Sequence, residues 1–187
     1  MTSDEISIQV VEILNASQIP YMLVGSLSTN FHSISRSTKD ADIVVQSNLA
    51  EAARHIAGQL DFLKLDPQYG FESVTATRKL VLRSSLGEGF IVELFGLSDD
   101  PHDQVRFSRR QSIDWEGRAA WIATAEDAIV TKLRWSSSVG REKDFVDARN
   151  VIAAQYDYLD WPYIESWCDQ HGSRQLLEKI RSELRRP

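Results

Sequence analysis

Residues 40–45, with the sequence DADIVV, place two carboxylates at alternating positions at the start of an apolar run. Side chains of a β-strand alternate between its faces, so Asp40 and Asp42 share one face and Ala41 and Ile43 the other. Two such carboxylates lie roughly 6–7 Å apart, and like charges this close repel and resist burial. A divalent cation removes that repulsion, so the pattern favours a strand that holds Mg²⁺ or Mn²⁺. A turn with solvated acids, leading into the strand, is the alternative.

A Gly-Ser step lies upstream, at the end of the apolar run YMLV. The pattern predicts a short buried strand that ends at Gly25, followed by one or two turns of helix that begin at Gly25-Ser26. Backbone N–H groups at a helix N-terminus bind anions, and glycine lets a phosphate approach closely. A strand-to-helix turn with Ser26 as a simple cap is the alternative. Neither a Walker loop nor a G-x-G-x-x-G motif is present, so the sequence gives no support to an ATPase or a Rossmann dehydrogenase.

Hydrophobic periodicity divides the chain into an α/β part, residues 1–123, and a helical part, residues 124–187, which we expect to pack on the core as one compact unit. In the α/β part we expect helices near 4–16 and 49–60, strands within 71–85 and 90–96, and a hairpin within 105–123 that turns at Glu116-Gly117. In the helical part we expect helices near 124–135, 141–154, 161–172 and 174–186.

Glu93 is an acid inside the otherwise apolar strand FIVELFG. A third carboxylate on a strand next to Asp40 and Asp42 would let two metal ions be held, the arrangement used for in-line phosphoryl or nucleotidyl displacement. A salt bridge from Glu93 to Arg78 or Arg83 is the alternative.

The order of these features resembles the signature of the nucleotidyltransferase superfamily: an apolar strand, Gly-Ser, a gap of 13 residues, then Asp-Ala-Asp and a second apolar strand. The phrases STKDADIVV, TAEDAIVTKLRW and REKDFVDARNVI resemble the AbiEii-like nucleotidyltransferases of abortive-infection and toxin–antitoxin systems. The resemblance covers residues 20–155. It implies an α+β fold of the DNA polymerase β type, with a small mixed sheet flanked by helices and a C-terminal helical part. It also implies an enzyme of the EC 2.7.7 type that transfers a nucleoside monophosphate from an NTP.

The resemblance assigns roles to individual residues of this chain. Mg²⁺ (or Mn²⁺) would be held by Asp40, Asp42 and Glu93, with Glu93 at a position where the family more often has Asp. Glu93 or a metal-bound base would activate the acceptor hydroxyl. The nucleotide would be bound by Gly25, Ser26, Lys39, Lys132, Arg141 and Asp144.

Lys132 would also act in catalysis, because an ammonium neutralises the charge of the leaving pyrophosphate. For Lys132 and Asp144, an ordinary ion pair between two helices is the alternative.

Charge and composition leave the acceptor open among RNA, a protein and a small molecule such as an aminoglycoside. The formal net charge of −6 argues against a large RNA footprint. The acidic start and the absence of a long apolar run favour a cytoplasmic protein without membrane contact. A cognate antitoxin partner is possible within the resemblance. The alternative function is a non-catalytic nucleotide-binding or scaffold protein that kept the fold.

Overall fold

The computed structural model describes residues 1–86 and 89–184, and the chain divides into two compact units. The first unit comprises Met1–Leu27 and Ser37–Ala123, and the second comprises Ser28–Arg36 and Thr124–Pro187. The segment Ser28–Arg36, which we predicted within the α/β part, therefore belongs with the C-terminal helices. The predicted packing of residues 124–187 on the core stays a prediction.

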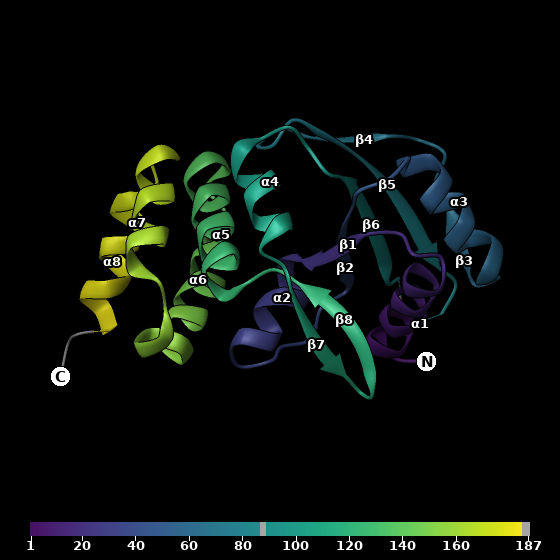
Figure 1. Cartoon of the computed structure of the whole chain (residues 1–187), viewed down its shortest axis with the longest axis horizontal. Helices are drawn as coiled ribbons and strands as arrows, with labels where there is room; N and C mark the ends of the chain where they lie inside the picture. The colour runs from purple at the N-terminus through teal and green to yellow at the C-terminus, as the bar shows by residue number, and fades with distance from the viewer. Residues whose placement is uncertain (87–88, 185–187) are drawn as a thin grey trace. The chain divides into compact units, whose positions relative to one another are not determined.

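The first unit is built on one mixed sheet, to which the described residues contribute eight strands (Figure 1). The strand order is β3-β5-β6-β2-β1-β8-β7, and β4 pairs with β5. β2 runs parallel to β6, β1 runs parallel to β8, and the other pairs are antiparallel. The strands are β1 (Tyr21–Val24), β2 (Asp40–Val45), β3 (Leu63–Leu65), β4 (Gly70–Glu72), β5 (Thr77–Ser84), β6 (Ile91–Gly96), β7 (Gln111–Trp115) and β8 (Arg118–Ile122).

Helices α1 (Ser3–Ala16) and α3 (Leu49–Gln59) cover one face of this sheet (Figure 1). Both helices begin within one residue of the predicted start. Their N-caps are Thr2 and Asn48, whose side chains accept hydrogen bonds from the first turn. Their apolar stripes pack against strand residues that include Ala41, Ile43 and Val45. Alternation along β2 therefore turns the opposite side chains, those of Asp40, Asp42 and Val44, toward the second face.

The second face of the sheet carries a smaller apolar cluster, which contains Met22, Val24, Val44, Phe95 and Phe107. Phe107 comes from α4 (Pro101–Ser108), which begins at the N-cap Asp100 and has Pro101 in its first turn. The cluster packs under α4. The start of β2, which carries Asp40 and Asp42, is not part of this apolar cluster.

The predicted hairpin is confirmed at its turn and wrong at its start. β7 and β8 are joined through Glu116 and Gly117, which both have positive φ, as the favoured two-residue hairpin turn requires. Residues 105–108, which we predicted as strand, form the end of α4 instead. The Asp100-Pro101 helix start outweighs the weak alternation that follows it, and it places Arg106 in a buried ion pair with Asp103.

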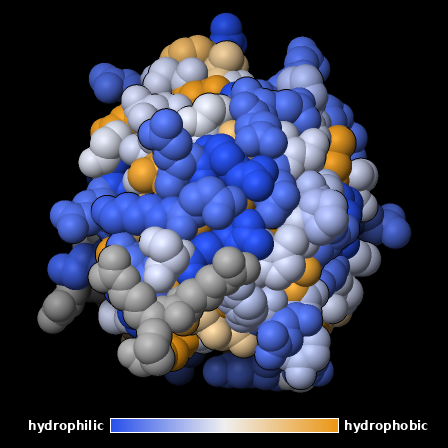
Figure 2. All heavy atoms as spheres, turned by 90° about the vertical axis from the view of Figure 1, so that its left-hand side faces the viewer, coloured by the Kyte–Doolittle hydropathy of each residue, from blue (hydrophilic) through white to orange (hydrophobic). Residues whose placement is uncertain are grey.

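The second unit is helical and has its own core, to which Leu133, Ile152, Cys168 and Leu177 belong. Figure 2 views the side that carries α7 and α8, and most of that face is hydrophilic. None of the helices in the described ranges is both long and apolar enough to cross a membrane. The elements are α2 (Gly25–His32), whose last part lies here, α5 (Ala125–Val139), α6 (Glu142–Gln155), the short helix η1 (Tyr156–Tyr158), α7 (Trp161–Gln170) and α8 (Arg174–Leu184).

Candidate active site

The carboxylate strand forms as predicted. Asp40 and Asp42 are half-buried. Ala41, which lies between them, and Ile43, which follows Asp42, are fully buried. The Thr38 hydroxyl donates a hydrogen bond to Asp40 Oδ1 and so fixes the first carboxylate at the start of β2. The two aspartates therefore share the face of the sheet that α1 and α3 leave uncovered.

Gly25 and Asp42 lie in direct contact. β1 pairs with β2 so that Val24 is opposite Asp42, and Gly25 follows at the start of α2 with φ of +59°. A Cβ atom on residue 25 would lie 2.0 Å from Asp42 Oδ2 and 2.9 Å from Asp42 Cγ. Glycine is required here twice, for the left-handed backbone and for the space that the carboxylate fills. The turn predicted to hold a phosphate therefore stands next to the predicted metal strand.

Glu93 lies directly opposite Asp42 across the parallel pair β2–β6. Residues in such register point to the same face, so Asp42 and Glu93 share it. The neighbouring strand β5 contributes Lys79, whose Nζ lies 2.6 Å from Glu93 Oε1. We predicted Arg78 or Arg83 as alternative partners of Glu93. Arg83 instead pairs with Asp66, at 3.2 Å.

The other two nucleotide-binding candidates of the first unit differ in exposure. The Ser26 side chain is almost fully buried at 4% relative exposure, so a phosphate there would meet backbone N–H groups at the start of α2 rather than a free hydroxyl. Lys39 has an exposed side chain, and its carbonyl accepts a hydrogen bond from Ile91 N. The Lys39 side chain is therefore accessible to a ligand, whereas the Ser26 side chain is covered.

The donors on this face suit a hard divalent cation. Asp40, Asp42 and Glu93 offer only carboxylate oxygens, which Mg²⁺ and Mn²⁺ prefer. No group of three or more His, Cys, Asp or Glu side chains among the described residues is arranged closely enough to hold a metal ion. Glu93 is instead engaged in its ion pair with Lys79. The two aspartates supply the carboxylate oxygens that such an ion prefers, and Glu93 would join them once its oxygen exchanges Lys79 for the metal.

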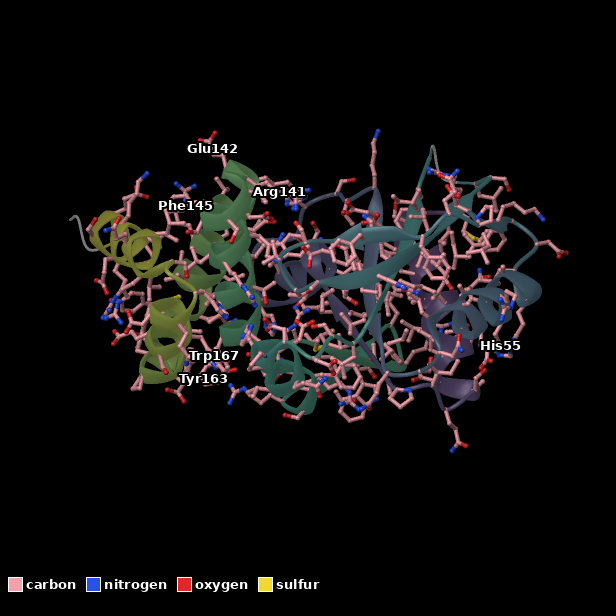
Figure 3. The ribbon with its side chains drawn as sticks, turned by 90° about the horizontal axis from the view of Figure 1, so that it is seen from above. His55, Arg141, Glu142, Phe145, Tyr163 and Trp167 are labelled. Carbon is pink, nitrogen blue, oxygen red and sulfur yellow. The ribbon has the colours of Figure 1, made fainter. Side chains whose placement is uncertain are left out.

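The second unit contains a buried ionic cluster that holds the remaining predicted residues. Lys132 Nζ on α5 lies 2.7 Å from Asp144 Oδ1 and 3.0 Å from Asp147 Oδ2 on α6. Arg36 makes two hydrogen bonds to Asp147, at 2.9 and 3.1 Å. Arg141 is the N-cap residue of α6 and is labelled in Figure 3. Its side chain contacts Asp144 at 3.5 Å. The ion pair between helices, which the sequence left open for Lys132 and Asp144, is present.

The neighbours of Asp147 in this cluster determine whether its carboxyl group is charged. Burial by itself raises the pKa of Asp147, but the hydrogen bonds from Arg36 and the charge of Lys132 outweigh burial and hold the pKa below its usual range. The carboxylate is therefore ionised at neutral pH, and it carries a structural ion pair with both cations.

Three residues of these clusters were missed by sequence reasoning. Asp147 follows Asp144 by three positions, so their shared helical face was visible in the sequence KDFVDAR. Lys79 sits at an alternating position of an apolar strand, which is a weak signal, because strand pairing decides its partner. Arg36 gives no local signal, since it lies in the connection between α2 and β2.

Comparison with known proteins identifies the fold. No family profile matches the sequence, and no curated protein matches it significantly. Among solved structures, the antibiotic-resistance factor ANT(2″)-Ia matches with a TM-score of 0.66 and 10% identity, over 96% of each chain. A nucleotidyltransferase-like antigenic protein from Paracoccidioides brasiliensis matches with a TM-score of 0.55 and 18% identity, over 96% of this chain and 93% of its own.

A third structure, the lincomycin-bound lincosamide adenylyltransferase LnuA, matches with a TM-score of 0.53 and 10% identity, over 79% of this chain and 94% of its own. The chain has a nucleotidyltransferase fold. The predicted α+β class, with a mixed sheet flanked by helices, is confirmed.

Proposed function

We propose that this chain is a nucleotidyltransferase that transfers a nucleoside monophosphate from an NTP to an acceptor hydroxyl with the help of Mg²⁺ or Mn²⁺. The observation that carries the proposal is the alignment of three elements around Asp42. The turn at Gly25 contacts its carboxylate, and Glu93 lies opposite it on β6. A phosphate-binding turn beside strand carboxylates suits nucleotidyl transfer, because the triphosphate and its cation bind together.

Each predicted site residue of the first unit has a proposed role that is compatible with its position. Asp40, Asp42 and Glu93 would hold the cation, which neutralises phosphate charge when it is bound. The N–H groups at the start of α2 would bind a phosphate, as helix N-termini do. Glu93 would accept the proton of the acceptor hydroxyl as that oxygen attacks the α-phosphorus, and pyrophosphate leaves. Lys39, which is exposed, would contact a phosphate or the acceptor.

The second unit contributes candidates whose roles in nucleotide binding stay predictions. Lys132 is engaged by Asp144 and Asp147, so a role in pyrophosphate release would require the phosphate to compete with two buried carboxylates. The Arg141 side chain is 53% exposed, against 11% for Lys132, and its ion pair with Asp144 is longer, at 3.5 Å, so Arg141 is the more available cation of the two.

The acceptor remains open among RNA, a protein and a small molecule, and small molecules are the first class to test. ANT(2″)-Ia is an antibiotic-resistance factor, and LnuA is an adenylyltransferase that binds lincomycin. Membership of the AbiEii-like group, and with it a cognate antitoxin, rests on the sequence resemblance.

A non-catalytic nucleotide-binding or scaffold protein is the second candidate, and the Lys79–Glu93 ion pair favours it. A lysine that permanently neutralised the third carboxylate would leave no base and an incomplete metal site. The two candidates differ in NTP turnover, which a scaffold lacks.

Calorimetric titration of each NTP with Mg²⁺ tests the proposal. We compare wild type with Asp42→Asn and with Asp61→Asn, a control that removes the same charge from an exposed turn. We expect wild type and Asp61→Asn to bind one NTP equally, and Asp42→Asn to bind it about a hundredfold more weakly while it still unfolds in one cooperative transition. Pyrophosphate release with a panel of acceptors then measures turnover. If folded wild type binds no NTP, the proposal is wrong.

A further inference from the structure

Lys79 forms an ion pair with Glu93, one of the three predicted metal ligands. It lies on β5, where Val81 is opposite Glu93, so Lys79 reaches diagonally across the strand pair. The side chains of Lys79 and Glu93 are 29% and 17% exposed, and their charged atoms are 2.6 Å apart. This half-buried pair is screened less by water and salt than a pair on the open surface.

The course of the Lys79 side chain is defined by its neighbours. Gly70 on β4 is opposite Lys79, and a Cβ atom there would lie 2.8 Å from Lys79 Cγ and 2.9 Å from Cε. The aliphatic stem thus crosses the surface that Gly70 leaves open. The ammonium lies 5.6 Å from the ring centre of Phe95, at the edge of the apolar cluster. The strand pairing and these two contacts direct the charge to Glu93.

The charge balance on this face explains what the pair does in the absence of a metal ion. Asp40, Asp42 and Glu93 share one face of neighbouring strands and repel one another. Lys79 brings one positive charge to the third of them. A lysine holds a carboxylate through a single compact charge, which a stronger cation can displace more readily than the two-point contact of an arginine.

We propose that Lys79 is a built-in counter-ion of the metal site, one that neutralises Glu93 until a divalent ion enters and then yields the carboxylate to it. The inference rests on the proposed function, because it assigns Glu93 to that metal. Lys79 acts through Glu93 and is a positioning residue. It lowers the affinity of the nucleotide-free protein for metal, so that metal and NTP bind together.

Titration of Mn²⁺, followed by electron paramagnetic resonance of the free ion without nucleotide, tests the inference. Lys79→Met removes the charge and keeps most of the stem, and we expect it to bind Mn²⁺ about tenfold more tightly than wild type. Lys79→Arg keeps the charge and adds a two-point contact that is harder to displace, so it should bind Mn²⁺ more weakly than wild type. Arg83→Met is the matched control, because it removes one charge from the same face of β5 but from a pair with Asp66. We expect it to change Mn²⁺ affinity by less than about twofold.

Gly70→Ala tests the position of the lysine with every charge kept. The added methyl group must push the stem aside, so Mn²⁺ affinity should rise, by less than in Lys79→Met. Thermal unfolding in EDTA is the second readout. Without metal, Lys79→Met should unfold at a lower temperature than wild type, and Mn²⁺ should raise its unfolding temperature more.

The outcomes separate this inference from the proposed function. If Lys79→Met and wild type bind Mn²⁺ equally while Asp42→Asn loses it, the metal site stands and the role of Lys79 is wrong. If no variant binds Mn²⁺, with or without NTP, both are wrong.

Discussion

Gly25 and Asp42 are so close that the space for a side chain on residue 25 is filled by the Asp42 carboxylate. The contact joins the residue that follows β1 to the neighbouring strand β2. It also restricts the direction in which Asp42 Oδ2 can point. The sequence predicted that Gly25 lets a phosphate approach closely. The structure shows that glycine is also required at this position to leave space for the Asp42 carboxylate.

We expect Gly25→Ala to lose NTP affinity by at least about tenfold, because the methyl group must turn the Asp42 carboxylate away. Gly117→Ala is the control, since Gly117 has φ of +80° with nothing within 4 Å of an added Cβ. It should lose only about 1–2 kcal/mol of unfolding free energy from left-handed strain. Gly25→Ala should lose about 1 kcal/mol more. Denaturant unfolding and NTP titration measure both, and equal results for the two variants would contradict the prediction.

Lys132→Met should destabilise the protein by about 3 kcal/mol without any nucleotide, because two buried carboxylates lose a partner. Chemical denaturation measures this loss. Lys143→Met, which changes an exposed lysine of α6, is the control and should be within about 0.5 kcal/mol of wild type. Unchanged or increased stability of Lys132→Met would mean that the lysine is kept for a phosphate alone.

Asp147→Asn should destabilise the protein by about 2 kcal/mol at neutral pH, because the hydrogen bonds and charge that Arg36 and Lys132 direct at Asp147 lose their anion. The folded pKa of Asp147 is lowered, so its contribution is complete above the unfolded value near 3.8 and is lost as pH falls through the folded pKa. Unfolding curves of both proteins between pH 3 and 7 should therefore converge only below about pH 4. A constant difference across this range would exclude the linkage.

Cys168 should be inert in the folded protein. Burial in the helical core raises the pKa of its thiol from 9.0 to about 11, so little thiolate forms near pH 8. A thiol reagent should label Cys168 at the rate of unfolding and much faster in denaturant. Because the folded pKa is raised, stability should also fall as pH rises from 9 toward 11. Rapid labelling of folded protein would contradict the buried position.

Local patterns predicted the elements well where one rule dominated. Alternation in residues 40–45 predicted β2, and apolar residues at helical spacing predicted α1, α3 and α5. The start of α4 failed, because the Asp100-Pro101 helix signal competed with a strand-like run. The site was partly predictable, since Asp40, Asp42 and Gly25 lie within one short stretch of sequence.

The partners of the site were not predictable, because strand order decides them. Glu93 pairs with Lys79 rather than with Arg78 or Arg83, since register and side-chain direction select one of three basic residues on β5. Arg36 and Asp147 pair over a large separation in the chain, and no local pattern reports such a contact.

The parallel pairing of β2 with β6 also limits when the site can exist. Asp42 and Glu93 are roughly fifty residues apart in the chain, so their alignment closes a long loop, which is slow compared with helix formation. A chain still on the ribosome exposes Asp40 and Asp42 well before β6 is made. The carboxylates meet only after β6 has docked beside β2, so any catalysis that depends on them begins with a late step of folding.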